Sequence, residues 1–337
     1  MKLLKRASHI LKSLPLYWES AADAAEKAGK RGILWRVYFY LDMLFAYAFQ
    51  GATRFDYMNY KFYWRNFLGR AEYTTEPNQD KLLSSIYGKK NFQYDFFNDK
   101  RRFNEKYARF IKRKWIYAPE SSPEEIRAFV KGLGRAIAKP NTSAQGQGIF
   151  KISDSEADLS KLFEALKENP DFLIEEIVEN HPDIARFNPT SLNTMRVVSV
   201  IDPEGAVHIQ NVSLRIGSGG GSVDNLSGGG MACAVDVENG IISSTAINLL
   251  YKRFAFHPDT GVKLLGSDLP MMDALPGFVE EVAKLDPKIR FVGWDIAATP
   301  SGFELIEGNS TPGTDVNQIC DDIGKFRLMK RLLLGSR

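Results

Sequence analysis

The chain has 337 residues, a formal net charge of +3 and 44% hydrophobic residues, which suit a folded globular protein and exclude a collagen-like, low-complexity or disulfide-scaffold chain. The charge is uneven: residues 1–119 carry 23 Lys and Arg against 11 Asp and Glu, whereas residues 120–337 carry 21 against 30. Two cysteines without metal-ligand spacing, Cys233 and Cys320, indicate a reducing compartment, so we expect a cytoplasmic protein.

The first 96 residues predict helices rich in aromatic side chains. The most apolar stretch, residues 32–50, is long enough to span a membrane, but Arg36 and Asp42 would each cost about 2.5–3.5 kcal/mol at the bilayer centre. We interpret it as a buried helix; the alternatives are a helix lying on a membrane surface and, third, a membrane span. The apolar run at the N-terminus does not read as an export signal, because basic residues interrupt it (Lys5, Arg6 and Lys12).

Two further helices follow. Asn98 and Asp99 offer a cap for a helix over residues 100–114, and Ser122, Pro123 and Glu125 form a capping box for a second helix. From Arg135 onwards short β-rich runs appear, separated by turn residues, and residues 321–334 predict a closing helix. The runs are RAIAK, GIFKIS, FLIEEIV, MRVVSVI, AVHIQNVSLRI, MACAVDV, GIISSTA, FVGWDIA and FELIEGN.

Common motifs of nucleotide and hydrolytic enzymes are missing. The sequence has no GxxxxGK[ST] loop, no GxGxxG after a strand, no GxSxG and no HExxH, and its four histidines lack ligand spacing. An enzyme that uses a nucleotide must therefore hold the phosphates in another way.

Residues 291–313 contain the most informative pattern. Pro300, Ser301 and Gly302 fit a three-residue hairpin loop that pairs Thr299 with Phe303.

This register places Asp295 opposite Glu307, with Asn309 on the same side two residues later. Two adjacent carboxylates repel unless a cation or a proton lies between them, and two carboxylates with an amide are ligands that suit Mg²⁺. The alternative is a pair of solvated strand carboxylates.

A second constellation lies at residues 136–150. A strand delivers Lys139, whose ammonium can meet a phosphate, and Gly146 and Gly148 allow backbone N–H groups to approach one closely. A flexible hairpin loop is the alternative. About 25 residues later, residues 172–178 form an apolar strand that ends in acids and could present its backbone to an adenine edge.

The order of these pieces resembles the ATP-grasp superfamily over about residues 97–319. More narrowly, the sequence resembles the sugar-transfer-associated ATP-grasp family of bacterial polysaccharide loci. The motifs that carry this resemblance are FNDK, LIEEIVENHPDIARFNPTSLNTMRVV, DNLSGGGMACAVD and GWDIA followed by FELIEGNSTPG. The resemblance implies an α+β ATP-grasp fold over residues 97–337, with a lid subdomain at about 118–180, preceded by a basic, aromatic helical region over residues 1–96.

The resemblance also implies a set of site residues. ATP would be held by Lys100 and Lys139 near its phosphates and by a lid formed by residues 145–148 (Gln145, Gly146 and Gly148 among them). At the adenine it would meet Glu175, Glu176 and Val178, largely through their backbone groups. Asp183 or Glu179 would hold the ribose. One or two Mg²⁺ ions would be held by Asp295, Glu307 and Asn309, and the substrate and transferred phosphate would meet Arg196, Arg215 and Asn225.

Such enzymes usually phosphorylate a carboxylate and then let an amine attack the acyl phosphate. We therefore expect an ATP-dependent carboxylate–amine ligase acting on a sugar or surface-polymer precursor, with a small-molecule or glycan carboxylate and an amine acceptor as partners. The alternatives are an ATP-grasp kinase that phosphorylates a sugar hydroxyl and a non-catalytic nucleotide-binding partner of a glycosyltransferase complex. No nucleic-acid-binding module is present, the basic N-terminal region leaves peripheral membrane contact open, and the sequence does not indicate an oligomeric state.

Overall fold

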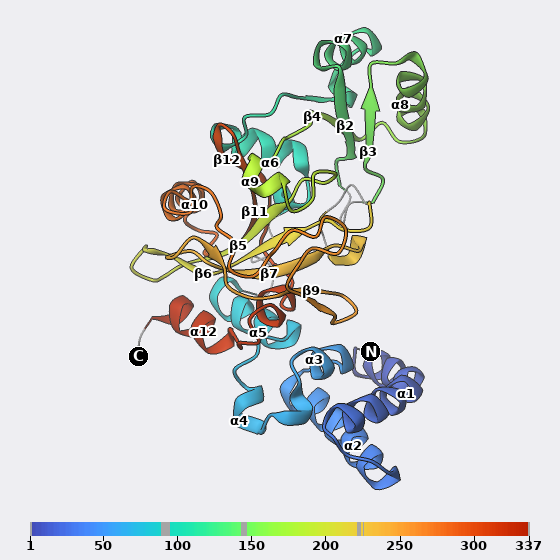
Figure 1. Cartoon of the computed structure of the whole chain (residues 1–337), viewed down its shortest axis with the longest axis vertical. Helices are drawn as coiled ribbons and strands as arrows, with labels where there is room; N and C mark the ends of the chain where they lie inside the picture. The colour runs from blue at the N-terminus through green and yellow to red at the C-terminus, as the bar shows by residue number, and fades with distance from the viewer. Residues whose placement is uncertain (1, 89–94, 143–146, 221–223, 225, 336–337) are drawn as a thin grey trace. The chain divides into compact units, whose positions relative to one another are not determined.

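The structure is a computed structural model that describes residues 2–88, 95–142, 147–220, 224 and 226–335. It divides into two compact units: one combines Met1–Lys90 with Gly313–Arg331, and the other combines Asn91–Pro312 with Leu332–Arg337. Figure 1 shows the chain from its blue N-terminal helices to its red C-terminal helix. The predicted helical start and the predicted β-rich remainder are both present.

The first unit is helical, and a partly buried ion pair joins its segments. Nη1 of Arg70 donates to Oδ1 of Asp42 at 2.8 Å, and the hydroxyl group of Tyr57 donates to the same carboxylate. Because a charge removed from water needs a partner, this pair explains how an otherwise apolar helix accommodates Asp42. The helices are α1 (Lys2–Lys27), α2 (Ile33–Gln50), α3 (Arg54–Asn59), η1 (Phe62–Trp64), α4 (Phe67–Arg70), α5 (Glu76–Tyr87), α11 (Val316–Ile319) and the first part of α12 (Phe326–Leu334).

Helix α2 coincides with the predicted helix of residues 32–50, but the interpretation of that helix as buried is wrong. Its buried residues are Phe39, Met43 and Ala46, whereas Leu34 is 80% exposed and Phe49 is 71% exposed. Apolar residues lie around the whole circumference of the helix, but only the side with Phe39, Met43 and Ala46 packs against neighbouring helices. Among the described residues, no helix is long and apolar enough to cross a membrane.

The closing helix, predicted over residues 321–334, begins only at Phe326. A Cβ atom at Gly324 would lie 2.5 Å from the carbonyl carbon of Glu72, and the backbone N–H of Phe326 donates to the carbonyl oxygen of Glu72 at 2.8 Å. This close approach requires a glycine, and the helix starts only after it.

The smaller sheet of the second unit has, within the described residues, four antiparallel strands in the order β1–β4–β2–β3. Helices α7 and α8 lie beside β2 and β3 (Figure 1), and Val130, Leu159 and Leu162 are fully buried between them and the sheet. The predicted capping box of Ser122 and Glu125 begins α7 and is confirmed. The elements are β1 (Trp115–Tyr117), η4 (Ala118–Glu120), α7 (Pro123–Leu133), β2 (Arg135–Pro140), β3 (Phe150–Ser153), α8 (Glu156–Glu168) and β4 (Phe172–Glu176).

The larger sheet, in the part of the chain that is described, has the antiparallel order β10–β9–β7–β6–β5–β11–β12, with β8 beside β7. One face carries the core, which includes Trp294, Leu214 and Val279 of α10 (Leu275–Lys284), and Nε1 of Trp294 donates to Oγ of Ser199 at 2.8 Å. The strands are β5 (Thr194–Ile201), β6 (Val207–Ile216), β7 (Met231–Asp236), β8 (Ile241–Ile242), β9 (Ala246–Asn248), β10 (Arg253–Phe254), β11 (Phe291–Thr299) and β12 (Gly302–Asn309).

The helix predicted over residues 100–114 is shorter in the structure. Asp99 caps it as expected, but α6 (Lys100–Lys106) gives way to a 3-10 turn in which the N–H of Phe110 donates to the carbonyl oxygen of Tyr107. Tyr107 and Phe110 are both buried in the core of the larger sheet. The other short helices are η2 (Asp95–Phe97), η3 (Ala108–Phe110), α9 (Pro182–Ala185) and η5 (Leu226–Gly228).

Candidate functional site

Asp295 and Glu307 lie directly opposite each other on the neighbouring strands β11 and β12, as the sequence predicts. Gly293 and Asn309 form the next pair on the same face, so Asn309 follows Glu307 along one side of the sheet. This is the face opposite to Trp294 and the core. The hairpin therefore places two carboxylates and one amide together on the polar face of the larger sheet.

The hairpin reaches this register by a different route from the predicted one. Thr299 pairs with Gly302 instead of Phe303, so the loop has two residues, and a β-bulge at Ile306 then adds one residue to β12. Ile296 pairs with Leu305, so regular pairing without the bulge would place Ile306 opposite Asp295. Glu307 would then point to the other face of the sheet, because successive residues of a strand alternate between the two faces. The prediction of a three-residue loop is wrong, yet the predicted carboxylate pair is present because the bulge compensates.

Asp295 is held by two arginines from the neighbouring strands β5 and β6. Nε of Arg196 lies 2.5 Å from Oδ1 of Asp295, and Nη2 of Arg215 lies 2.7 Å from its Oδ2. Asp295 is 1% exposed. Burial opposes its ionisation, but the guanidinium groups of Arg196 and Arg215 outweigh burial and hold the pKa of this carboxyl well below its usual range. Asp295 is therefore ionised at neutral pH.

Glu307 has the opposite tendency. Partial desolvation by the surrounding protein and the negative charge of Asp295 raise the pKa of Glu307, although the positive charges of Arg215 and Arg196 oppose this rise. The side chain of Glu307 is nevertheless exposed to solvent. Because the two carboxylates repel each other, a positive charge brought to this position would stabilise the ionised form of Glu307.

The arginine cluster continues to Asp224, which the sequence analysis did not select. Oδ2 of Asp224 lies 3.7 Å from Nε of Arg215 and accepts a hydrogen bond from the backbone N–H of Thr194 at 2.8 Å. Burial raises the pKa of Asp224, and Arg215 opposes that rise. In the sequence, Asp224 directly precedes Asn225, which the resemblance had selected, and this adjacency could have identified Asp224.

A second charged cluster centres on Glu175 of β4, which is 1% exposed. Its Oε2 atom lies 2.6 Å from Nζ of Lys139, and its Oε1 atom lies 3.2 Å from Nε of Arg113 and accepts from Nδ2 of Asn104 at 2.9 Å. Despite burial, which raises it, the pKa of Glu175 is well below its usual range, because Arg113 and Lys139 favour the carboxylate. The expectation for Glu175 concerned its backbone at the adenine, and its carboxylate contacts Lys139 and Arg113.

Lys100, the other lysine expected near phosphate, stands at the start of α6. Its Nζ atom donates to the carbonyl oxygen atoms of Pro140 at 3.2 Å and Asn141 at 3.3 Å. Burial lowers the pKa of Lys100, the charge of Lys139 adds to this effect, and the charge of Glu307 opposes it. The charge of Lys100 is thus affected by residues of both clusters.

A cavity of about 580 Å³ adjoins this site, within the range of pockets that hold small ligands. Lys139 lines it, together with Glu176 at the end of β4 and residues 177–180 after it. The lining also includes polar residues of β2 and β3 and three apolar residues, which come from both sheets and from the segment before β5 (Ile137, Leu192 and Ile306). Sequence reasoning did not select these three apolar residues, because an apolar residue in or beside a strand is most often part of a core.

The residues expected around the base and sugar of ATP are distributed unequally. Glu176 and Val178 line the cavity, and so does Glu179, one of the two alternatives for the ribose. The other alternative, Asp183, has a side chain that is 60% exposed and does not belong to the lining. Glu175 does not belong to the lining, but its carboxylate contacts Lys139, which does.

Three of the expected residues lie outside the described part of the chain: Gln145, Gly146 and Asn225. Gly148 is described and has a φ angle of +73°, which favours glycine. A Cβ atom at Gly148 would lie 2.8 Å from Cγ of Pro140, so a larger residue would press against the end of β2.

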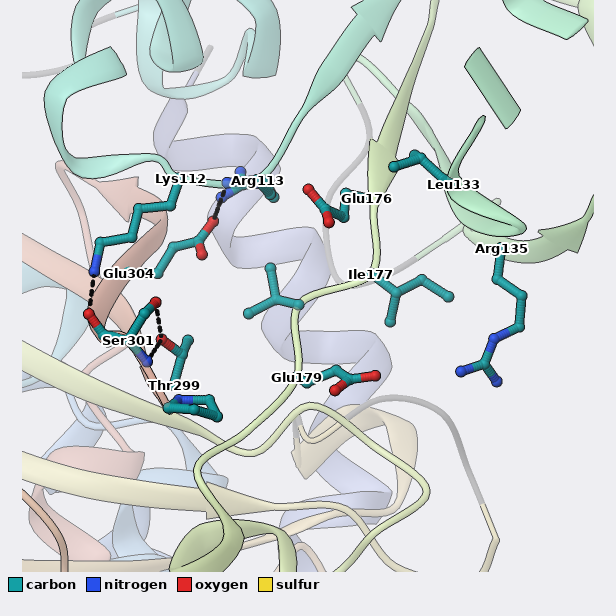
Figure 2. A pocket seen from close by; sticks show the side chains of 12 residues that line it. Lys112, Arg113, Leu133, Arg135, Glu176, Ile177, Glu179, Thr299, Ser301 and Glu304 are labelled. Carbon is teal, nitrogen blue, oxygen red and sulfur yellow. Dashed lines mark hydrogen bonds and ion pairs between the residues drawn. The ribbon is translucent and has the colours of Figure 1, made fainter. Parts of the chain in front are cut away.

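A second cavity of about 500 Å³ lies on the segment after β4 and is shown in Figure 2. Glu176, Ile177 and Glu179 line it from one side, and the turn of the β11–β12 hairpin lines it from the other (Figure 2). Nζ of Lys112 donates to the carbonyl oxygen of Ser301 at 2.8 Å and ties that turn to the segment before β1. The segment of residues 176–179 therefore faces two cavities.

The carboxylate hairpin fits a divalent cation. Asp295 and Glu307 offer carboxylate oxygens, and Oδ1 of Asn309 accepts one hydrogen bond, from the N–H of Thr311 at 2.9 Å, which leaves it a second lone pair. Among the described side chains, no group of three or more His, Cys, Asp or Glu could hold a metal ion. A Mg²⁺ ion would therefore depend on Asn309 and on oxygen atoms of a bound ligand as well.

Solved structures similar to this chain include D-alanyl-alanine synthetase A from Vibrio cholerae, with 13% identity, a TM-score of 0.43, and coverage of 70% of this chain and 64% of that one. Biotin carboxylase from Campylobacter jejuni has 13% identity, a TM-score of 0.46 and coverage of 81% and 54%. The D-alanine–D-alanine ligase from Coxiella burnetii has 8% identity, a TM-score of 0.44 and coverage of 70% and 57%. The chain spans less than two thirds of the length of each.

Among curated proteins, none matches the sequence. A family model described as sugar-transfer associated ATP-grasp matches residues 70–332, which is most of the chain and includes both charged clusters and the cavity beside them. The resemblance seen in the sequence is confirmed, together with the expected α+β fold: this chain belongs to the sugar-transfer associated ATP-grasp family.

Proposed function

We propose that this protein is an ATP-dependent ligase that activates a carboxylate as an acyl phosphate and transfers the acyl group to an amine. The observation that carries the proposal is the convergence of Arg196 and Arg215 on the carboxylate pair of Asp295 and Glu307. These arginines provide fixed positive charge where a phosphoryl group and a carboxylate would meet. The family description suggests a sugar or surface-polymer precursor as the substrate.

The cavity beside Lys139 would hold ATP. Its apolar residues Ile137 and Ile306 would offer surfaces to the faces of an adenine ring, and the backbone near Val178 would offer hydrogen bonds to its edge. Lys139 would meet the phosphates, with its ammonium group oriented by Glu175.

Asp295, Glu307 and Asn309 would hold Mg²⁺, which when bound supplies charge neutralisation for the phosphate oxygens. Since Asp295 already accepts from two arginines, it would share its oxygen atoms among them and the ion. The charge of Asp295 opposes the ionisation of Glu307. Of the proposed ligands, Glu307 would therefore be the one whose ionisation depends most on a bound cation.

In the proposed reaction, an oxygen of the substrate carboxylate attacks the γ-phosphorus of ATP, and the bond between that phosphorus and the β,γ-bridging oxygen breaks to release ADP. An amine then attacks the acyl carbon, phosphate leaves, and the proton lost by the amine nitrogen passes to the released phosphate. Arg196 and Arg215 would bind the carboxylate and then the acyl phosphate. A carboxylate is already ionised at neutral pH and needs no base, which agrees with the described histidines being bonded elsewhere (His181, His208 and His257).

The test is product analysis by mass spectrometry after incubation with ATP, Mg²⁺ and panels of uronic acids and amino acids. We expect ADP, phosphate and an amide, and with hydroxylamine as the amine we expect a hydroxamate. A stable phospho-sugar would favour a kinase, AMP as a product would contradict the acyl phosphate, and binding of ATP without turnover on any carboxylate would favour a non-catalytic nucleotide-binding partner. Glu307→Gln should abolish turnover, whereas Glu280→Gln, which alters an exposed acid on α10, should not.

A further inference from the structure

The outward side of α2 exposes a continuous row of large apolar residues. Leu34, Tyr38, Leu41, Phe45 and Phe49 recur at helical spacing and are 80%, 53%, 58%, 43% and 71% exposed. Single exposed apolar residues are ordinary on a protein surface, but a row that occupies one side of a whole helix indicates an interaction surface.

This row continues onto the neighbouring helix α4. The rings of Phe45 and Phe67 lie 6.2 Å apart, and the side-chain amide of Gln50 donates to the carbonyl oxygen of Phe67 at 3.2 Å. Phe67 is 52% exposed and Leu68 is 72% exposed. We call the combined surface the aromatic face; its residues are Leu34, Tyr38, Leu41, Phe45, Phe49, Phe67 and Leu68.

The aromatic face carries no charge from α2, because both charged residues of that helix have partners within the helical unit. The guanidinium group of Arg36 lies 4.4 Å from the ring centroid of Trp18, and its Nε atom donates to the carbonyl oxygen of Trp18 at 3.0 Å. Asp42 is paired with Arg70. Burial of the aromatic face in an apolar medium would therefore leave no charge of α2 without a partner.

Basic side chains lie at the start of α2, at one end of the aromatic face. Lys27, Lys30 and Arg31 are exposed at the turn that leads into α2, and Nζ of Lys30 lies 4.8 Å from the ring centroid of Trp35. The exposed carboxylates of this part of the unit lie on other helices, namely Glu19, Asp23 and Glu26 on α1 and Glu76 and Asp80 on α5.

We propose that the aromatic face binds the surface of a membrane that contains anionic lipids. Long apolar side chains together with Trp and Tyr suit the boundary between lipid headgroups and acyl chains, where an aromatic ring can lie with its polar end in water. The basic residues at the start of α2 complement anionic headgroups. The helix lies on the membrane and does not cross it, in agreement with the lack of a spanning helix among the described residues.

The test is flotation of the full chain with vesicles of 70% phosphatidylcholine and 30% phosphatidylglycerol. We expect the protein to float with these vesicles, and Leu34→Glu/Leu41→Glu/Phe45→Glu to reduce the bound fraction at least tenfold. The matched control is Leu265→Glu/Leu285→Glu, which changes residues that are 38% and 43% exposed in the other unit and should float like the unmodified protein. Lys30→Glu/Arg31→Glu should weaken binding about tenfold or more, because each basic residue near an anionic surface contributes to the attraction.

A second measurement does not depend on the folding of the acidic variant. Brominated lipid should quench the tryptophan emission of the unmodified protein, and Trp35→Phe should reduce this quenching, since Trp35 is 40% exposed and its ring centroid lies 5.7 Å from that of Tyr38 on the aromatic face.

Three results would overturn the proposal. The unmodified protein could fail to float, or the acidic triple variant could float equally well. Alternatively, light scattering could show a dimer that the triple variant converts to a monomer, in which case a second copy of the chain covers the aromatic face.

Discussion

Nζ of Lys139 lies 2.6 Å from Oε2 of Glu175, a carboxylate that is almost completely removed from solvent. On the other side of the same carboxylate, Nε of Arg113 lies 3.2 Å from Oε1. Glu175 thus joins the strand that carries Lys139 to the segment before β1. This ion pair fixes the ammonium group of Lys139 at the end of β2.

Glu175→Gln should destabilise the protein by about 3–5 kcal/mol, because breaking a buried ion pair leaves charges without a partner. The free energy of unfolding in urea at pH 7 measures this effect. Glu176→Gln is the control, since the carboxylate of Glu176 is only half-buried and accepts from the N–H of Lys114 at 3.0 Å. Equal stability of the two variants would contradict the assigned role of Glu175.

The acid stability of the protein should depend on the same residue. Arg113 and Lys139 hold the pKa of Glu175 below its ordinary value of 4.5 against the effect of burial, so its ionised form stabilises the fold above pH 4.5 and this contribution disappears as the pH falls further. The difference in unfolding free energy between the unmodified protein and Glu175→Gln should therefore shrink between pH 5 and pH 3. A difference that is constant with pH would rule this explanation out.

Glu307→Gln should have opposite effects on activity and on stability. Activity should fall about 100-fold or more, because one ligand of the proposed metal ion is lost. Without Mg²⁺ the melting temperature at pH 7 should rise, since partial desolvation by the surrounding protein and the charge of Asp295 raise the pKa of Glu307, and ionisation above its ordinary pKa of 4.5 therefore destabilises the fold. The gain should vanish at pH 4, and stabilisation of the protein by Mg²⁺ with ADP should be weaker in the variant.

Arg196→Lys should change the affinity for the carboxylate substrate more than the affinity for ATP. Nε and Nη2 of Arg196 contact both oxygens of Asp295, at 2.5 and 3.2 Å, and a lysine keeps the charge but not this forked contact. We expect the KM for the carboxylate to rise about tenfold, with a smaller change for ATP. Arg127→Lys, which alters an exposed ion pair on α7, serves as the control, and equal changes in both KM values would contradict the assignment.

Ile306→Ala should raise the KM for ATP about tenfold, because the side chain offers an apolar surface to the proposed adenine position. The side chain of Ile306 is only half-buried and contributes little to the core, so the melting temperature should change only slightly. Ile323→Ala, at a residue that is 56% exposed, is the matched control. An unchanged KM would place the adenine elsewhere.

Local patterns in the sequence predicted much of the fold. The strands that supply the site, the cap of α6 and the capping box of α7 depend on residues within a few positions of each other, and all are present in the structure. The ordered motifs also identified the family. The length of α6 and the start of α12 were predicted less well, because distant contacts decide them: burial of Tyr107 and Phe110 for the one and close approach to Glu72 for the other.

The sequence by itself determined that β11 and β12 form a hairpin, since the strands are adjacent in the chain and a short turn connects them. The bulge at Ile306, which the local pattern did not predict, decided that Glu307 lies opposite Asp295. Only the tertiary structure decided that two arginines neutralise Asp295, that Glu175 orients Lys139, and that the outer side of α2 stays uncovered. The ion pairs join strands that are far apart in the sequence, and the exposure of α2 depends on which of its sides packs against another helix. Residue spacing within one segment does not determine long-range contacts or which side of a helix is covered.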